Sequence, residues 1–213
     1  MKAENMVKAI GRLKKVKTSK SGNTELILHI EEGDIMAEPT FILNGALDPE
    51  IVRGDIVEIE GRIRATRYRD GKDAQWEYEQ NFIAEKVKIA KSEMEEKFGY
   101  KGTIHKPFEM RVFVSGAVSN VKDLGRKFFL VSVATKSSNE LGKLNYVSTH
   151  YYNGGKLPNA AELTRGDEVN VMLKLKTTIK KKENGEERRF ENLYVEDFVV
   201  LKKGDGEHLP TFE

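Results

Sequence analysis

The stretch from Arg165 to Leu201, RGDEVNVMLKLKTTIKKKENGEERRFENLYVEDFVVL, predicts a strand, a long charged hairpin tip and a returning strand. A weaker copy runs from Arg53 to Ile89, RGDIVEIEGRIRATRYRDGKDAQWEYEQNFIAEKVKI. Both copies open on Arg-Gly-Asp and continue into the alternating apolar residues that are typical of a half-buried strand. Both then turn at a glycine inside a polar tip. The duplicated hairpin indicates a chain built from two related halves.

The remaining segments follow the same order in each half. In the first half we expect a short helical turn after Asp48-Pro49 and strands over 6–16, 24–30, 40–44, 55–68 and 76–89. In the second half we expect a short helix over 160–163, capped by Asn159. Three strands precede that helix, over 110–121, 127–134 and 144–151. Gly116 stands five residues before Val121, as Gly11 stands five before Val16.

Five strands with a short helical piece between the third and fourth is the order of an OB-fold barrel. A repeat of roughly 105–112 residues indicates duplicated domains and not a solenoid. We therefore predict an all-β protein of two tandem five-stranded OB-fold barrels with short helical connections and a short C-terminal tail. The predicted segments are a first barrel over 1–90, a linker with a short helix over 91–106, a second barrel over 107–203 and a flexible tail over 204–213.

Composition excludes few classes of protein. The chain has 213 residues, a formal net charge of +2 and no cysteine, so overall basicity does not indicate a partner. No apolar run approaches the ~20 residues that span a bilayer, and the start lacks the apolar core of a signal peptide. We expect no membrane association and a cytoplasmic location.

Positive charge is nevertheless concentrated in the two hairpins. Residues 174–190 hold seven Lys and Arg against three Glu, and residues 62–78 hold five Lys and Arg against three acidic residues. Such local excess is the electrostatic footprint of a site for a polyanion. A solvated hairpin tip with no ligand is the alternative interpretation.

The second half resembles the bacterial single-stranded DNA-binding protein family over about 55 residues. The resemblance is carried by an aromatic third strand, a Gly-Lys-Leu stretch, an Arg-Gly-Asp-x-Val strand and a Val-rich last strand. These are Tyr146-Val147-Ser148, Gly155-Lys156-Leu157, Arg165-Gly166-Asp167-Glu168-Val169 and Glu196-Asp197-Phe198-Val199-Val200. The resemblance implies binding of single-stranded DNA in replication, recombination or repair, and pairing of two such chains as a homodimer.

Two features depart from that family. Its members usually carry a tryptophan in the third strand, where this chain offers Tyr146, Tyr151 and Tyr152. The family's tail ends in acidic residues followed by Pro-Phe and contacts partner proteins. This chain ends Asp205-Gly206-Glu207-His208-Leu209-Pro210-Thr211-Phe212-Glu213, so the resemblance suggests a partner-binding tail through Leu209, Pro210 and Phe212.

Binding single strands without reading sequence requires cations for phosphates and aromatic faces for bases. Within the first hairpin we expect one face to carry Arg62, Arg64, Thr66 and Tyr68 and the return strand to present Trp76, Tyr78, Gln80 and Phe82, forming a stacking platform. The barrel core is the alternative for Trp76 and the favoured place for Phe82. Tyr146, His150 and Tyr152 share a strand face, and Phe128 and Phe129 point to opposite faces. The predicted nucleic-acid-binding residues are Arg62, Arg64, Arg67, Tyr68, Trp76, Tyr78, Tyr146, Tyr152, Lys156, Lys174, Lys176, Lys180, Lys181, Lys182, Arg188 and Arg189.

The sequence does not favour catalysis. Its four histidines are scattered without metal-ligand spacing, and it has no Walker-type phosphate loop. We therefore expect no enzyme activity, no metal and no cofactor. Two alternatives to DNA binding stay open, an OB-fold adaptor whose main partner is a protein of a replication complex, and a binder of single-stranded RNA.

Overall fold

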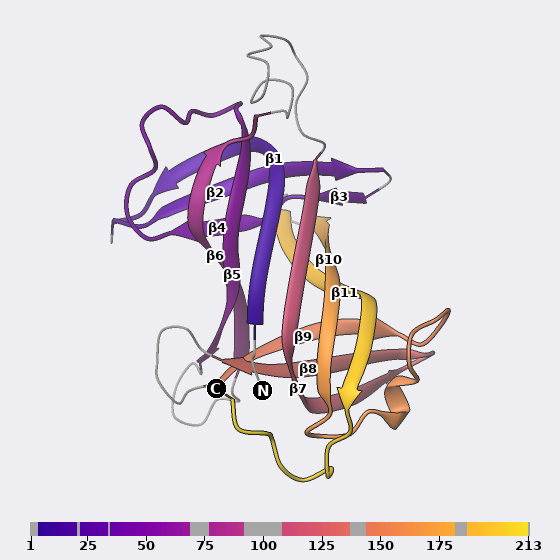
Figure 1. The fold of residues 1–213 in the computed structure, drawn as a ribbon. Helices are drawn as coiled ribbons and strands as arrows, with labels where there is room; N and C mark the ends of the chain where they lie inside the picture. Colours follow the sequence, from indigo (N-terminus) through magenta and orange to yellow (C-terminus); the bar gives the residue numbers. More distant parts are fainter. Residues whose placement is uncertain are drawn as a thin grey trace.

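The computed structural model describes residues 4–20, 22–33, 35–68, 77–91, 108–136, 144–181 and 187–212. Its first half contains six strands, β1 (Glu4–Thr18), β2 (Thr24–Glu32), β3 (Ile35–Ala37), β4 (Thr40–Leu43), β5 (Ile56–Tyr68) and β6 (Glu77–Ile89). Its second half contains β7 (Glu109–Gly125), β8 (Phe128–Lys136), β9 (Leu144–Tyr152), β10 (Glu168–Lys181) and β11 (Glu187–Lys202) (Figure 1). The prediction of an all-β chain is confirmed. Within these ranges there is no helix long and apolar enough to cross a membrane.

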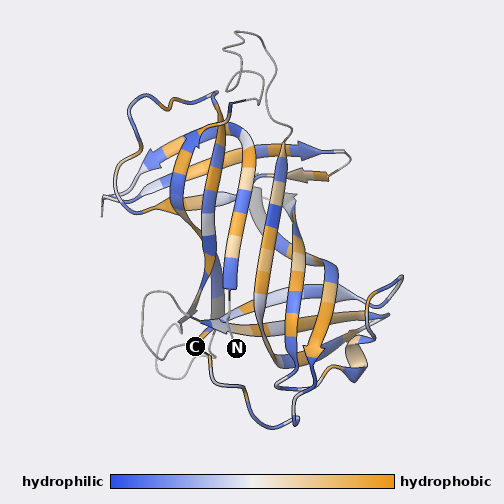
Figure 2. Cartoon of the chain, in the orientation of Figure 1, coloured by the Kyte–Doolittle hydropathy of each residue, from blue (hydrophilic) through white to orange (hydrophobic). Residues whose placement is uncertain are grey.

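Strand pairing follows the same scheme in the two halves. In the first half β1 pairs with β5, β5 with β6, β6 with β4, β4 with β2, and β2 again with β1. In the second half β7 pairs with β8, β8 with β9, β9 with β11, β11 with β10, and β10 again with β7. Each set of five strands thus forms a closed cycle of pairings, which leaves few free backbone edges inside it. Hydropathy alternates along the long strands, because one face covers the core and the other faces water (Figure 2).

Helical connections are shorter than expected. In place of a helix over 160–163, a single 3-10 turn (η1, Ala160–Glu162) follows Asn159, whose side chain accepts a hydrogen bond from the Ala161 N–H. After Asp48 the chain makes a hydrogen-bonded turn, with the Ile51 N–H donating to the Asp48 carbonyl at 3.0 Å. The linker helix predicted within 91–106 falls on residues 92–106, outside the described ranges.

The third strand of the first half is interrupted. We expected one strand over 40–44, whereas two short strands, β3 and β4, pair with β2 in one continuous register. Pro39 lies between them and lacks the N–H that a strand ladder needs. The corresponding strand of the second half, β9, contains no proline and runs unbroken.

The two Arg-Gly-Asp segments form the same turn. In the first half the Leu13 N–H donates to the Asp55 carbonyl and the Gly54 N–H donates to the Leu13 carbonyl, both at 2.8 Å. In the second half Val118 makes the same two bonds with Asp167 and Gly166, again at 2.8 Å. Both glycines have φ near +90°, a conformation that other residues rarely adopt. The repeated motif is therefore a structural device that ties the fourth strand of each half to its first strand.

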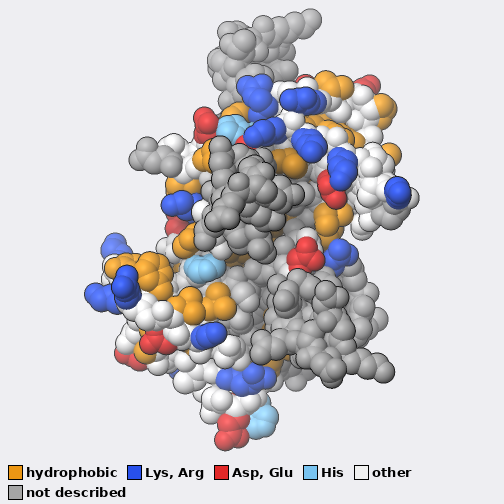
Figure 3. Space-filling model, turned by 180° about the vertical axis from the view of Figure 1, so that it is seen from behind, with side chains coloured by type: hydrophobic (Ala, Val, Ile, Leu, Met, Phe, Trp, Pro, Cys, Tyr) orange, Lys and Arg blue, Asp and Glu red, His pale blue; other side chains and the backbone are white. Residues whose placement is uncertain are grey.

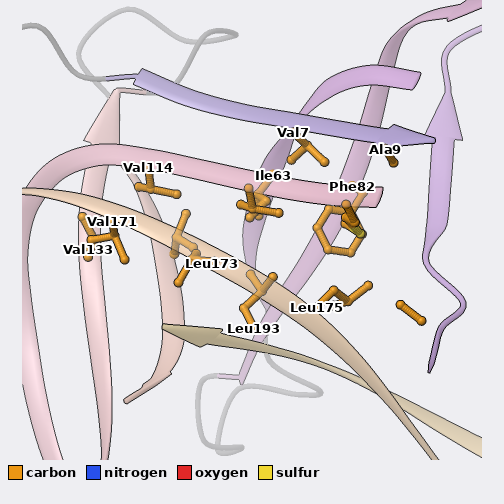
Figure 4. Packing of buried hydrophobic residues seen from close by; sticks show 14 of the residues in the cluster. Val7, Ala9, Ile63, Phe82, Val114, Val133, Val171, Leu173, Leu175 and Leu193 are labelled. Carbon is orange, nitrogen blue, oxygen red and sulfur yellow. The ribbon is translucent and has the colours of Figure 1, made fainter. Parts of the chain in front are cut away.

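Each hairpin also reaches across to the opposite half. On the β5–β6 side, Gln80 bonds both backbone groups of Ser148 on β9, accepting from its N–H at 2.7 Å and donating to its carbonyl at 3.1 Å. On the β10–β11 side, the Thr40 N–H on β4 donates to Glu191 at 3.1 Å. One buried apolar cluster runs through both halves and includes Ile63, Phe82, Leu175 and Leu193 (Figure 4). The favoured core position of Phe82 is confirmed.

Candidate nucleic-acid interface

The outer face of β9 is the aromatic surface that the sequence predicts. Along this strand Asn145, Val147, Thr149 and Tyr151 are buried, so the alternate residues Tyr146, Ser148, His150 and Tyr152 point outward. Tyr146 is 37% exposed and Tyr152 is 50% exposed, although large hydrophobic residues are usually covered. The predicted shared face of Tyr146, His150 and Tyr152 is confirmed.

An open groove of about 390 Å³ lies beside Tyr146. Its walls combine one aromatic ring, one guanidinium and several hydroxyl and amide groups, from Ser119, Asn120, Leu130, Ser132, Tyr146, Ser148 and Arg165. The Arg165 guanidinium donates to the Ser119 carbonyl at 2.8 Å, and the hydroxyls of Ser132 and Ser148 lie 3.2 Å apart. A ring beside polar groups that both donate and accept hydrogen bonds suits a nucleobase.

A second exposed aromatic surface stands at the end of the same sheet. The rings of Phe128 and Tyr152 pack at 4.9 Å between centroids. Phe128 is exposed and Phe129 is buried, which confirms that they point to opposite faces. The tight turn before Phe128 places Arg126 and Lys127 at φ values of 53° and 67°. Left-handed backbone at residues other than glycine costs of order 1 kcal/mol or more, and here both residues are exposed cations that directly precede Phe128 in the chain. Figure 3 shows hydrophobic side chains bordered by Lys and Arg at this edge of the lower half.

The first hairpin does not form the predicted stacking platform as one face. Its register pairs Arg62 with Ile83 and Arg64 with Asn81, whereas Gln80 pairs with Ala65. Directly paired residues share a face, so Arg62 and Arg64 lie on the side opposite Gln80 and Phe82. Arg62 is ion-paired with Glu85 at 3.2 Å, and Arg64 is solvent-exposed. Trp76 lies outside the described residues, as do the side chains of Arg67, Tyr68 and Tyr78.

The second hairpin offers fewer available cations in its described part than the sequence suggests. Lys174 is ion-paired with Glu196 at 2.8 Å and lies 4.0 Å from Glu32, so its charge is largely balanced within the molecule. Lys176 is exposed on the same face. Lys182 and the side chains of Lys180, Lys181, Arg188 and Arg189 lie outside the described residues. In the loop before η1, Lys156 is also exposed.

The first part of the tail, residues 204–208, is hydrogen-bonded to the Arg-Gly-Asp turn of the second half or within itself. The Gly204 N–H donates to Asp167 at 2.9 Å, and Arg165 donates through Nε to the Glu207 carbonyl at 3.0 Å. Backbone N–H groups of His208 and Glu207 hydrogen-bond the Asp205 carboxylate and hold its pKa well below its usual range. The sequence predicts a flexible tail from residue 204, whereas these contacts hold its backbone as far as His208. Leu209, Pro210 and Phe212 are half-buried.

A third basic segment lies outside the predicted binding residues. Residues 12–20, RLKKVKTSK, contain five cations and no acidic residue, and all five cations are exposed, namely Arg12, Lys14, Lys15, Lys17 and Lys20. Figure 3 shows Lys and Arg gathered over the upper part of the molecule, where the end of β1 lies. The local density of charge in the sequence is the signal that would have found them.

In the part of the chain that the structure describes, no cluster of His, Asp and Glu has the arrangement of a metal site. No protein-family model and no curated protein matches the sequence. Among solved structures, a deletion variant of the single-stranded DNA binding protein from Thermus aquaticus matches with a TM-score of 0.59 and 14% identity, over 97% of this chain and 99% of that chain. The wild-type protein from the same organism matches with a TM-score of 0.57 and 14% identity, over 98% of each chain. At this identity the match shows that the chain has their fold.

Proposed function

We propose that this protein binds single-stranded DNA without reading its sequence, through the outer face of β7, β8 and β9. The observation that carries the proposal is the exposed Tyr146 at the rim of a polar groove. The Phe128–Tyr152 ring pair on the same sheet supplies a second stacking surface. Stacking of a base on an aromatic ring contributes roughly 1–3 kcal/mol and depends little on the base.

Exposed cations supply the electrostatic part of the affinity. Arg126 and Lys127 lie in the turn before Phe128, and Arg64, Lys156 and Lys176 are exposed elsewhere on the molecule. Each phosphate contact on a single strand lowers the slope of log K against log salt by about 0.7. The fold shared with proteins described as single-stranded DNA binding proteins supports the same proposal.

The proposal also covers the finer architecture, the assembly and the cellular role of the protein. Each closed cycle of five strands is an OB-fold barrel, and two chains associate as a homodimer. The protein acts in the cytoplasm during DNA replication, recombination or repair, as a binding protein and not as an enzyme. Leu209, Pro210 and Phe212 in the tail contact partner proteins of those processes.

Fluorescence anisotropy with labelled oligo-dT tests the central proposal. We expect tight binding at low salt, weaker binding to duplex DNA, and a tenfold or larger loss of affinity in Tyr146→Leu/Tyr152→Leu. Val199→Ala, which alters an exposed residue on β11, is the matched control and retains wild-type affinity. Absence of oligo-dT binding at low salt, or preference for duplex, overturns the proposal, and stronger binding to oligo-rU reassigns the site to RNA.

A further inference from the structure

The duplication allows the groove beside Tyr146 to be compared with the same place in the first half. In each half the pairing of the first strand with the second skips a residue at the same place, Lys14 in β1 and Ser119 in β7, and β7 skips Leu124 as well. These two residues are therefore counterparts, as are Lys15 and Asn120. The registers of the third strands make Glu38 the counterpart of Tyr146, since Ile27 pairs with Thr40 as Ser132 pairs with Ser148.

In the first half an ionic cluster occupies the place of the aromatic groove. Glu38 is only 2% exposed, and its Oε1 accepts hydrogen bonds from Lys14 Nζ and, at 3.1 Å, from His29 Nδ1. The other ring nitrogen of His29 lies 2.9 Å from Glu31, so both nitrogens are engaged. The backbone N–H of Glu38 donates to the Thr177 hydroxyl of the β10–β11 hairpin at 2.9 Å, which attaches the backbone at Glu38 to that hairpin. The first half thus offers a base neither the tyrosine nor the open hydroxyl-lined groove of the second half.

Exposed lysines lie on the same strand as Lys14 and in the turn that follows it. Lys15, Lys17 and Lys20 are exposed, and none has an ion-pair partner among the residues that the structure describes. Where the second half has the neutral Asn120 in its groove, the first half has Lys15. Along one strand and its turn, three ammonium groups that have no ion-pair partner in the described part of the chain present a row of point charges suited to successive phosphates.

We infer that the two duplicated faces have separated roles, with the β7–β9 face of the second half binding bases and the end of β1 in the first half binding only the sugar-phosphate backbone. This inference rests on the proposed function and adds a division of the ligand between the halves. It predicts that Lys15, Lys17 and Lys20 contribute more than the other exposed cations to the affinity for a strand without bases. Tyr146 then contributes to the affinity only when the strand carries bases.

An abasic oligonucleotide of the same length as oligo-dT separates the two contributions. In Lys15→Gln/Lys17→Gln/Lys20→Gln we expect binding to the abasic strand to fall at least tenfold. The salt slope for oligo-dT falls by about 2, as loss of three phosphate contacts requires. In Tyr146→Leu/Tyr152→Leu we expect an unchanged affinity for the abasic strand and a loss on oligo-dT alone. The charge-matched control Lys86→Gln/Lys91→Gln/Lys202→Gln, at exposed lysines outside β7–β9 and outside residues 12–20, leaves the abasic affinity and the slope near wild type.

Photocrosslinking of oligonucleotides that carry 5-iodouracil supplies a second readout, with crosslinked peptides expected from β7–β9 and none from residues 12–31. An unchanged salt slope in the triple lysine variant, or base crosslinks within residues 12–31, overturns the division of roles while leaving DNA binding intact. Failure of the wild-type protein to bind either strand overturns the proposed function itself, so the two failures are distinguishable.

Discussion

Val7 on β1 pairs directly with Val112 on β7, which is its own counterpart 105 positions later in the duplicated chain. The neighbouring pairs mirror each other about this point, since Glu4 lies opposite Ser115 and Ile10 opposite Glu109. A pseudo-twofold axis therefore passes between the two valines. The contact between the halves has the self-complementary form of a symmetric dimer interface, here built within one chain.

Close backbone approach at two glycines makes them sensitive to any side chain. A Cβ on Gly116 would lie 2.1 Å from the Ala134 carbonyl oxygen, and one on Gly61 would lie 2.0 Å from that of Ile83. We expect Gly116→Ala and Gly61→Ala each to lower the free energy of unfolding by about 1–3 kcal/mol, because the backbone must shift. Urea denaturation measures the change. Gly154→Ala, whose nearest neighbour is the movable ring of Tyr152, is the control and should lie within about 0.5 kcal/mol of wild type.

The buried carboxylate of Asp167 gives stability that depends on pH. Burial alone would raise the pKa of Asp167, but hydrogen bonds from the Thr164 and Gly204 N–H groups, Lys203 and the Thr164 hydroxyl outweigh it and hold the pKa below its usual range. A carboxyl with a lowered pKa in the folded state stabilises fully above its unfolded pKa of about 3.9, and this contribution is lost as pH falls toward the folded pKa.

We therefore expect Asp167→Asn to cost about 1–3 kcal/mol of unfolding free energy at pH 7, since two backbone N–H groups lose their charged acceptor. The difference from wild type should shrink below about pH 4 in urea titrations at several pH values. Asp55→Asn, at the half-exposed counterpart, should cost less. A difference that stays constant from pH 7 to pH 3 would contradict the assigned role of the carboxylate.

The amide of Gln80 attaches the first hairpin to the strand that lines the groove. Replacing it by alanine leaves the Ser148 N–H and carbonyl without their partners, so we expect a loss of about 1–2 kcal/mol in unfolding free energy. Weaker oligo-dT binding should accompany it, because Ser148 lines the groove. Glu79→Ala changes the exposed neighbour on the opposite face of β6 and should alter neither quantity. Equal effects of Gln80→Ala and Glu79→Ala would contradict the role of Gln80 in attaching the first hairpin to β9.

The buried hydroxyl of Tyr151 is expected to lower the stability of the protein at alkaline pH. Burial raises the pKa of Tyr151 to about 12, and its hydroxyl donates to the Pro158 carbonyl. An acid with a raised folded pKa is destabilising once its unfolded form ionises, so stability falls as pH rises above about 10. Tyr151→Phe should remove this part of the alkaline loss and cost about 1 kcal/mol at pH 7. Thermal unfolding between pH 7 and 11 measures the alkaline loss of stability and the cost of the substitution at pH 7. If the unfolding temperatures of the wild type and of Tyr151→Phe fall equally with rising pH, the prediction is contradicted.

Features with a local signature were predictable from the sequence. Alternation from 144 to 152 places Tyr146, His150 and Tyr152 on one face, and the glycines at 11 and 116 mark the same position in both halves. The repeat of Arg-Gly-Asp located the turn that starts the fourth strand, although its role as a structural turn emerged only from its hydrogen bonds.

Features set by register or by contacts between distant segments were not predictable. Alternation fixes which residues of one strand share a face, but not which face of the partner strand they join. Arg62 and Gln80 were therefore placed together wrongly. The bonds of Gln80 to Ser148 and of Lys14 to Glu38 join separate segments through single side chains, and such contacts leave no periodic trace in the sequence.

The reciprocal docking of the hairpins has a consequence for synthesis of the protein. The edge of β1 from Glu4 to Ile10 can pair with β7 only after residue 115 has left the ribosome. The β5–β6 hairpin can bond to Ser148 only later still. Until then the nascent first half exposes an unpaired strand edge and apolar side chains such as Ile63, both of which favour aggregation. A ribosome that stalls between residues 91 and 108 would hold the chain in this vulnerable state, so the rate of translation across the junction bears on the yield of folded protein.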